Sequence, residues 1–357
     1  MVAGIANAQK PFRKFQIGVE TTYDVEVAAT RLLRITGLTW NDLGSQRQFI
    51  PDYDIGRLSK HSDVGSIIRT GALGRIEAPL TFEDFLFPCL SGFMTATGVE
   101  ITGAQGDYLW TFKLDPNTGD PTPKSFTAEF GVSDGTTTWP RTAPGLLCTG
   151  FEISAAQDGD VAQMAMDFFT GGPNGNALAA LTPPTPFTTI PVLNWKLYID
   201  DTWAAMDQLA VAPSYGGGAL KSTTLRSFTY RYQGGISPAL YIGAGQTDPQ
   251  GFKFNKRGPE LELEVEFNAV IAAERTKAET SGTKRYVRLI AEGARIGTGY
   301  NKTILLQGAY IYPDGGFGEL GRDADGTEVV TLRLEGVADD DTEDTEIRVI
   351  NSLSSFP

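Results

Sequence analysis

The stretch that decides the fold is Glu260-Leu261-Glu262-Leu263-Glu264-Val265-Glu266-Phe267, in which acidic and apolar residues alternate without a break. An alternation with a period of two places the apolar side chains on one face of a strand and the carboxylates on the other. A strand with one buried and one solvated face is typical of antiparallel sheets. The stretch therefore predicts a β-strand with an acidic outer face.

The same alternation recurs in other parts of the chain, between frequent glycines and prolines. There are 41 glycines and 20 prolines in 357 residues, and most segments between them are short and strand-like. The sequence therefore predicts a mainly β protein. The apolar positions of the other alternating segments are Met164, Met166, Phe168, Phe228, Tyr230, Tyr232, Val330, Leu332 and Leu334.

Two segments show helical rather than strand spacing. Apolar residues recur at helical spacing from Phe82 to Phe93, with Thr81 as the expected N-cap and Pro88 as a residue that should kink or shorten the helix. The second expected helix is the alanine-rich segment from 268 to 281. It should turn Ile271 toward the core and its charged residues toward solvent. Those charged residues are Glu274, Arg275, Lys277 and Glu279.

Breaker residues concentrate between positions 171 and 192, which predicts a linker. On either side of it the expected elements follow a similar order: two strands, a helix, and further strands that include an Asp-Gly turn before the last long one. This order predicts two tandem domains, each a β-sandwich with a flanking helix. The predicted divisions are an extended N-terminal arm at 1–28, a first domain at 29–170, the linker at 171–192 and a second domain at 193–357.

The composition excludes several classes of protein. The net charge is −13, with 43 acidic and 30 basic residues, so the surface should repel nucleic acid rather than bind its phosphates. No apolar run reaches the roughly 18 residues of a membrane span, and the N-terminus lacks a secretory signal pattern. Two cysteines do not make a disulfide framework, which indicates folding in a reducing cytoplasm.

Residues with catalytic or metal-binding chemistry are scarce. His61 is the single histidine and stands in a polar, loop-like stretch, so it predicts neither a catalytic triad nor a zinc site. Cys89 and Cys148 lie in apolar surroundings and are expected to be buried thiols. The acidic segments 323–328 and 339–344 lack calcium-loop spacing and are interpreted as solvated loops. We expect a protein that is not an enzyme and that has no cofactor or metal.

An N-terminal motif offers the best indication of function. Gly18-Val19-Glu20-Thr21-Thr22-Tyr23 resembles the opening segment of tail tube proteins (major tail proteins) of long-tailed, siphovirus-type bacteriophages. Asp24 stands where that family often carries glycine. Further stretches resemble later strands and the strand-to-helix passage of the same family. These stretches are 70–82, 123–129, 150–154 and 225–230.

The resemblance implies a structural virion protein that polymerises as stacked rings into the tail tube, the conduit for DNA ejection. In that family, strands of neighbouring subunits close into a β-barrel around a channel, through which DNA passes without specific binding. The implied partners are further copies of the chain and the tape measure, tail terminator and distal tail proteins. The implied location is the virion tail, assembled in the host cytoplasm, with no membrane contact.

Two tandem units per chain change the expected ring. If single-domain relatives place six units in a ring, three chains suffice here, which predicts a trimer with pseudo-sixfold symmetry. Two alternatives remain open at this point. One is a secreted carbohydrate-binding β-sandwich, and the other is a different virion component, either a tail terminator or a capsid decoration protein.

Two sets of residues are the candidates for function. Strands that face a DNA channel should present acidic side chains, because lysine or arginine there would bind phosphates. The alternative is that these carboxylates lie on the outer surface of the tube. The candidates for the channel wall are Glu262, Glu264, Glu266, Asp167 and Glu335. The candidates for an adhesive assembly arm are Phe12, Phe15 and Tyr23.

Overall fold

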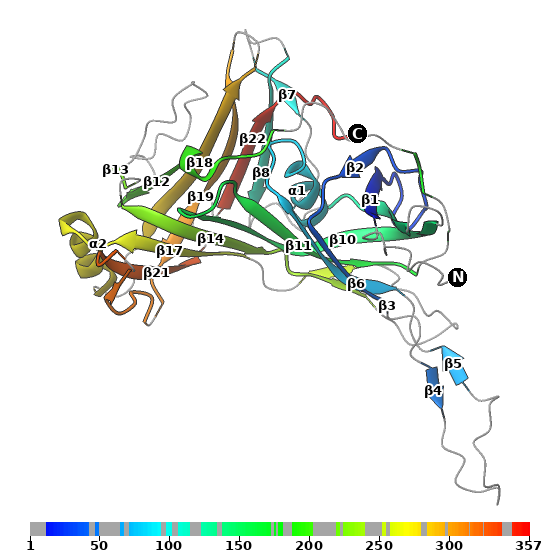
Figure 1. Cartoon of the computed structure of the whole chain (residues 1–357), viewed down its shortest axis with the longest axis horizontal. Coiled ribbons are helices and arrows are strands. Elements are labelled where there is room, and N and C mark those ends of the chain that lie inside the picture. The colour runs from blue at the N-terminus through cyan, green and yellow to red at the C-terminus, as the bar shows by residue number, and fades with distance from the viewer. Residues whose placement is uncertain are drawn as a thin grey trace, which may run out of the picture.

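The computed structural model shows a mainly β protein in which large antiparallel sheets surround helix α1 (Figure 1). In the part of the chain that the structure describes, all paired strands run antiparallel. The residues that the structure describes are 12–42, 47–49, 65–67, 71–93, 98–101, 106–114, 123–133, 138–172, 175, 178–180, 188–202, 219–221, 224–239, 252–254, 258–279, 284–296, 299–313, 315–323, 325–337 and 345–357.

The central sheet combines strands from both halves of the sequence. Its strands, in spatial order, are β3 (Gly37–Asp42), β6 (Ala72–Pro79), β11 (Gln163–Thr170), β10 (Thr138–Ala156), β14 (Leu225–Gln233), β17 (Gly258–Glu266) and β21 (Glu328–Gly336), with the short β20 (Gly321–Arg322) beside β21.

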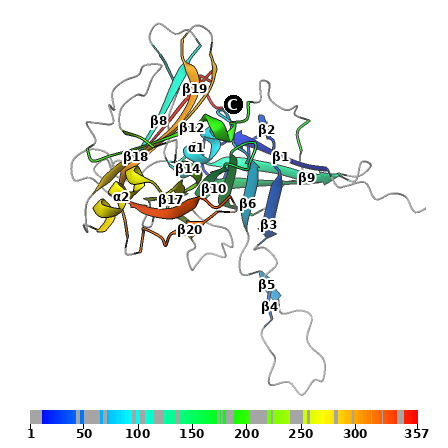
Figure 2. The same ribbon diagram turned by 60° about the vertical axis from the view of Figure 1, so that its left-hand side comes forward.

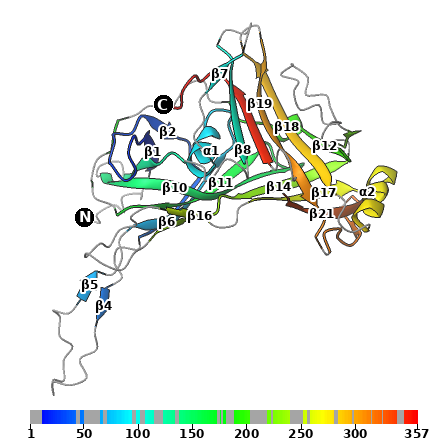
Figure 3. The same cartoon turned by 180° about the vertical axis from the view of Figure 1, so that it is seen from behind.

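A second and a third sheet pack against the inner face of the first. The second contains β2 (Arg31–Leu33), β1 (Phe12–Val19), β9 (Phe126–Ser133) and the first part of β10. The third, seen from behind in Figure 3, contains β13 (Ala219–Leu220), β12 (Trp195–Asp200), β18 (Arg285–Arg295), β19 (Asn301–Ile311), β22 (Thr345–Asn351), β8 (Tyr108–Leu114) and β7 (Val99–Glu100).

The remaining elements are short. Two separate two-stranded sheets are formed by β4 (Arg47–Phe49) with β5 (Gly65–Ile67) and by β15 (Ile236–Pro238) with β16 (Phe252–Phe254). The helices are α1 (Leu86–Gly92) and α2 (Ala269–Glu279), and Val192–Asn194 forms a 3-10 turn.

Strand β10 belongs to two sheets because its pairing is irregular. It pairs with β9 from Thr138 to Leu146 and with β11 from Leu147 to Ser154, and its register shifts between Ala143 and Leu146 and again between Cys148 and Gly150. Such irregularities bend a strand and increase its twist. Among the described residues, strand pairings branch but never return to their starting strand, so this part of the chain forms open sheets and not a closed barrel.

One hydrophobic core joins the three sheets. The alternating apolar residues expected from the sequence point into it: Met166, Tyr230 and Leu332 are each no more than 1% exposed. Phe82, Phe85 and other aromatic side chains around α1 fill the space between the sheets. At roughly 1.5–3 kcal/mol for each large apolar side chain, this burial is the main source of stability.

The first helix is shorter than the spacing predicted. It begins at Leu86, because residues 82–85 form turns, although the Thr81 hydroxyl accepts a hydrogen bond from the Asp84 N–H at 2.9 Å, as expected of a capping residue. Pro88 lies in the first turn of the helix, where a backbone N–H would have no partner within the helix. The proline therefore fits without the expected kink.

The second helix closely follows its prediction, with one exception. The Asn268 side chain accepts hydrogen bonds from the N–H groups of Val270 and Ile271, and Ile271 is buried. Glu274, which we expected to face solvent, is 2% exposed. The expectation was wrong because Glu274 pairs with the buried Arg285 of β18, at 2.9 Å from Nε and 2.8 Å from Nη2.

The structure also corrects the predicted N-terminal arm at residues 12–19, which form a strand. Phe12–Val19 is strand β1, which pairs along its whole length with β9, and Phe15 and Ile17 are fully buried. The alternation of Phe15, Ile17 and Val19 is the signal for this strand, and the basic residues around it obscured that signal. This segment is thus part of the core and not an extended arm.

The halves on either side of the predicted linker share one sheet. Gly150 to Ala156 of β10 pairs with Ser227 to Gln233 of β14. Ile190, within the predicted linker, is buried; its N–H donates a hydrogen bond to the Leu80 carbonyl, and its carbonyl accepts one from the Ala162 N–H. Residues 173–174, 176–177 and 181–187 of the linker lie outside the described residues. The division into two domains stays a prediction.

Candidate functional site

The outer face of the central sheet is charged across most of its strands. Residues opposite each other in an antiparallel pair share a face, and the pairs Glu152–Arg231, Arg231–Glu260 and Glu260–Glu335 follow one another across four strands. We call this surface the charged face. Its members are Arg75, Glu77, Glu152, Asp167, Arg231, Glu260, Glu262, Glu264, Glu266, Arg333 and Glu335.

The structure brings the candidates for the channel wall together on the charged face. Glu262, Glu264 and Glu266 lie on β17, and Glu335 lies on the neighbouring β21. Asp167 lies on β11, beyond β10 and β14 on the same sheet. The sequence placed these residues on separate strands, and the pairing of β10 with β14 unites them. Whether this face lines a channel stays a prediction.

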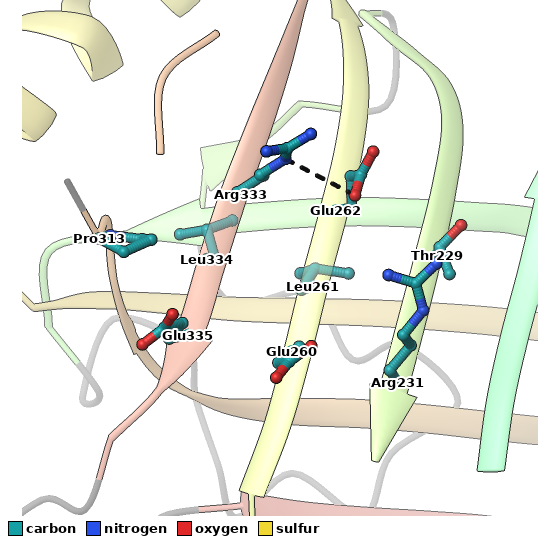
Figure 4. Close-up of a pocket in the computed structure, with 9 residues that line it drawn as sticks. All are labelled: Thr229, Arg231, Glu260, Leu261, Glu262, Pro313, Arg333, Leu334 and Glu335. Atoms are coloured by element: carbon teal, nitrogen blue, oxygen red, sulfur yellow. Dashed lines mark ion pairs between the residues drawn. The ribbon is translucent and has the colours of Figure 1, made fainter. Parts of the chain in front are cut away.

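Each arginine of the charged face has carboxylate neighbours. Arg75 lies 3.2 Å from Asp167, Arg231 donates a hydrogen bond to Glu152 at 2.9 Å, and Arg333 lies 3.8 Å from Glu262. Figure 4 shows Arg333 pointing toward Glu262 across β21 and β17. The hydrogen bond to Glu152 raises the pKa of Arg231 above its ordinary value.

These ion pairs are solvent-exposed, and exposed pairs stabilise a protein by only about 0–1 kcal/mol each. Their effect on the surface field matters more. Carboxylates outnumber arginines on the charged face, and the arginine charges are compensated by their neighbours. The face is therefore acidic overall and presents no unpaired cationic cluster that could hold a phosphate backbone.

A shallow pocket opens on the charged face between β14, β17 and β21 (Figure 4). Its floor includes Leu261 and Leu334, and charged side chains form its walls. No histidine or cysteine lines it, and no group of potential metal ligands occurs among the described residues. Its polar and charged lining residues are Thr229, Arg231, Glu260, Glu262, Arg333 and Glu335.

The sequence-based prediction of the channel wall named acidic side chains only and did not include the arginines of the charged face. Their signal was present in the sequence: Arg333 alternates with Leu332 and Leu334, and Arg231 alternates with Tyr230 and Tyr232. The alternation places them on the polar face. Which carboxylates they meet depends on strand register, which the sequence of one strand does not determine.

The shape of the N-terminal motif depends on a buried carboxylate, that of Glu20. Glu20 accepts hydrogen bonds from the Gly145 N–H at 2.8 Å and the Thr127 hydroxyl at 2.9 Å, and from the Asp24 N–H at 3.0 Å. Asp24 has a φ of 62°, the left-handed conformation that glycine favours. The motif therefore forms a tight loop fastened to β9 and to the irregular part of β10.

The three candidates for the assembly arm lie in different surroundings. Phe15 is a core residue, and the side chain of Phe12 lies outside the described residues. Tyr23 packs edge-to-face on Phe252 of β16, with ring centroids 5.9 Å apart, and burial raises its pKa. The structure does not bring these side chains into one exposed surface. A role for them in assembly stays a prediction.

Cys89 and Cys148 are buried, as predicted, and burial raises the pKa of both thiols. His61 and residues 339–344 lie outside the described residues. In the described part of the chain, neither helix has the length and apolar character needed to cross a membrane.

Comparison with known proteins does not assign a family. No protein-family model matches the chain, and no curated protein gives a significant match.

Proposed function

We propose that this chain is a structural virion protein of a long-tailed bacteriophage, which assembles as stacked rings into the tail tube through which DNA leaves the capsid. The observation that carries the proposal is a repeated strand order within one continuous sheet. The resemblance of the N-terminal motif to tail tube proteins supports the same function.

The order of neighbouring strands supports a repeat. In the first half the order is β3, β6, β11, β10. In the second half the order is β14, β17, β21 and then the segment that runs on from the end of β19. In this segment Phe317 forms a β-bridge with Leu332 of β21. A helix follows the second strand of each set: α1 follows β6 and α2 follows β17. We infer two tandem units of the same topology.

Single positions in the core also support the proposed repeat. Leu38, Ile76, Met166 and Phe151 lie opposite one another across the four strands of the first set. Phe228, Leu263, Leu332 and Phe317 do so across the second. The inner sheets agree, since β1, β9 and β10 are neighbours in the first half and β12, β18 and β19 in the second. Shared register at this level supports a duplicated unit.

The junction between the units supports ring assembly. The last strand of the first unit, β10, pairs with the first strand of the second, β14, so the two units join side by side into one wider sheet. Side-by-side units of one kind form a closed ring when rotation from unit to unit returns to the start. With two units per chain, we propose a ring of three chains with pseudo-sixfold symmetry. The ring would close a barrel that the described part of one chain leaves open.

The charged face supplies a suitable channel wall. It is one side of the sheet that would be continued around the ring, and its arginines are compensated by carboxylates such as Glu152 and Asp167. Such a wall lets DNA pass without sticking, because phosphates find no net positive surface. We further propose that the rings contact the tape measure, tail terminator and distal tail proteins, and that assembly in the host cytoplasm places the protein in the virion tail.

Electron microscopy of the purified protein tests the proposed function. Tubes or stacked rings, with threefold symmetry of the density and a central channel, are the expected result. Rings of six chains would contradict the trimer, and particles that remain single chains at high protein concentration would contradict tube formation. Retention on a glycan array without rings would favour the alternative of a carbohydrate-binding module. A single closed ring without stacking would favour a tail terminator.

A further inference from the structure

The central sheet has one edge at each end. Each edge corresponds to one of the two strands, β14 and β10, that pair where the two proposed units join. In the described part of the chain, β3 pairs only with β6, whereas its counterpart β14 is covered by β10. At the other end, the segment 316–322 pairs only with β21, whereas its counterpart in β10 is covered by β14. Figures 1 and 2 show β3 and the β21 end at opposite sides of the sheet.

The register of β10 with β14 indicates how a further strand would pair with these edges. Phe151 lies opposite Tyr232, and Phe317 is the counterpart of Phe151. Phe228 of β14 is the counterpart of Leu38 of β3. Tyr232 lies four residues after Phe228, so the counterpart of Tyr232 is Asp42, four residues after Leu38. An equivalent junction therefore places Phe317 opposite Asp42 and, because antiparallel strands run in opposite directions, Leu320 opposite Thr39.

The side chains at both edges suit a partner of the same kind. Thr39 and Asn41 are exposed, whereas Leu38 and Trp40 between them pack toward the core. Leu320 is 47% exposed although it is a large apolar residue. Unpaired strand edges favour addition of another strand, and an apolar side chain beside such an edge gains from being covered.

We infer that β3 of one chain pairs antiparallel with the segment 316–322 of a second copy of this chain, so that each chain joins the next head to tail. The inference rests on the proposed function for its biological meaning, but its evidence is the internal β10–β14 junction. It names the partner of both edges and the residues that meet there: Thr39 of one copy and Leu320 of the next.

Cysteine cross-linking tests the pairing. The variant Thr39→Cys with Leu320→Cys should form covalent dimers and larger oligomers under mild oxidation, because opposite side chains on paired strands lie about 4.5–5.5 Å apart between Cβ atoms. The pairing register of the segment 316–322 with β21 shifts by one residue between Phe317 and Gly321. For this reason Thr39→Cys is also combined with Gly321→Cys. The matched control combines Thr39→Cys with Val99→Cys, since Val99 is exposed on β7, away from both edges. The native cysteines are buried and stay in all variants.

The outcomes separate this inference from the proposed function. Cross-linked oligomers in either edge pair, with none in the control and none in the single variants, support head-to-tail pairing. Absence of cross-links in both edge pairs overturns it, provided that circular dichroism and thermal unfolding match the unsubstituted protein. Electron microscopy of the unsubstituted protein tests the function independently. Tubes without these cross-links would support the tail tube function and contradict this interface. Cross-linked oligomers without tubes would support the interface and contradict the tail tube function.

Discussion

Arg231 of the second half of the chain donates a hydrogen bond from Nε to Oε2 of Glu152 in the first half, at 2.9 Å, across neighbouring strands of one sheet. The two residues are separated by the whole of the predicted linker, yet they lie opposite each other on the charged face. Their pairing shows that this face is built by both halves together.

Reversing the charge of β17 should turn the charged face into a DNA-binding surface. The triple variant Glu262→Lys, Glu264→Lys, Glu266→Lys places cations beside Arg333 and Arg226, which lie 3.8 Å from Glu262 and Glu266 in the unsubstituted protein. Binding of short duplex DNA, followed by fluorescence anisotropy, should appear in the variant and weaken steeply as salt is raised. In phage particles that carry this variant, tubes should assemble but genome ejection should slow.

The matched control for this prediction is the triple glutamine variant, which removes the same negative charges without adding positive ones. It should bind DNA far more weakly than the lysine variant. Equal binding by the two, or unchanged ejection with the lysine variant, would show that the charged face does not meet DNA.

The buried ion pair between helix α2 and β18 should carry much of the stability of that region. Glu274 and Arg285 are 2% and 1% exposed, and burial raises the pKa of Glu274 and lowers that of Arg285. Glu274→Ala removes the partner of Nε and Nη2 and leaves the buried guanidinium of Arg285 with Asp201 on Nη1 alone. The loss should therefore lie toward the lower end of about 3–5 kcal/mol of the free energy of unfolding. Urea unfolding measures this loss.

Helix α2 provides its own comparison. Arg275 and Glu279 form an exposed pair at 3.0 Å, one turn apart, and Glu279→Ala should cost no more than about 0.5 kcal/mol. Similar losses for the Glu274 and Glu279 variants would mean that burial does not distinguish these pairs.

Removing β1 should prevent folding. Deletion of residues 1–20 takes away Phe15 and Ile17, each worth roughly 1.5–3 kcal/mol, and uncovers the edge of β9. We expect aggregation on expression and loss of the cooperative thermal transition. Deletion of residues 1–11, which keeps all of β1, is the control and should keep that transition. A cooperatively folded protein without residues 1–20 would restore the idea of a dispensable arm.

The two thiols should react only after unfolding. Both are buried, and burial raises the pKa of Cys89 and of Cys148, so at pH 8 the reactive thiolate is rarer than in a free cysteine. Titration with Ellman's reagent should detect almost no reactive thiol in the native protein and two reactive thiols per chain in denaturant. Rapid reaction of the native protein would contradict the packing around α1.

The sequence predicted those parts of the fold that depend on local pattern. Alternation in Glu260–Phe267 gave the strand and its faces, and Asn268 marked the start of the second helix, because both signals act over a few residues. Burial of Glu274 could not be predicted, since it depends on Arg285 arriving from another strand. The charged face was likewise only partly predictable: each strand showed its polar side, but register between distant strands joined the sides into one surface.

The position of β22 has a consequence for how the molecule is made. This strand follows every other described strand along the chain, yet it lies between β19 and β8 and pairs with both. Just beyond it, the Leu353 carbonyl accepts a hydrogen bond from Trp110, 243 residues earlier in the sequence. During translation, β8 therefore emerges long before its neighbour exists. A nascent chain reaches its finished shape only after β22 has been synthesised, which delays any contact with other copies until each one is whole.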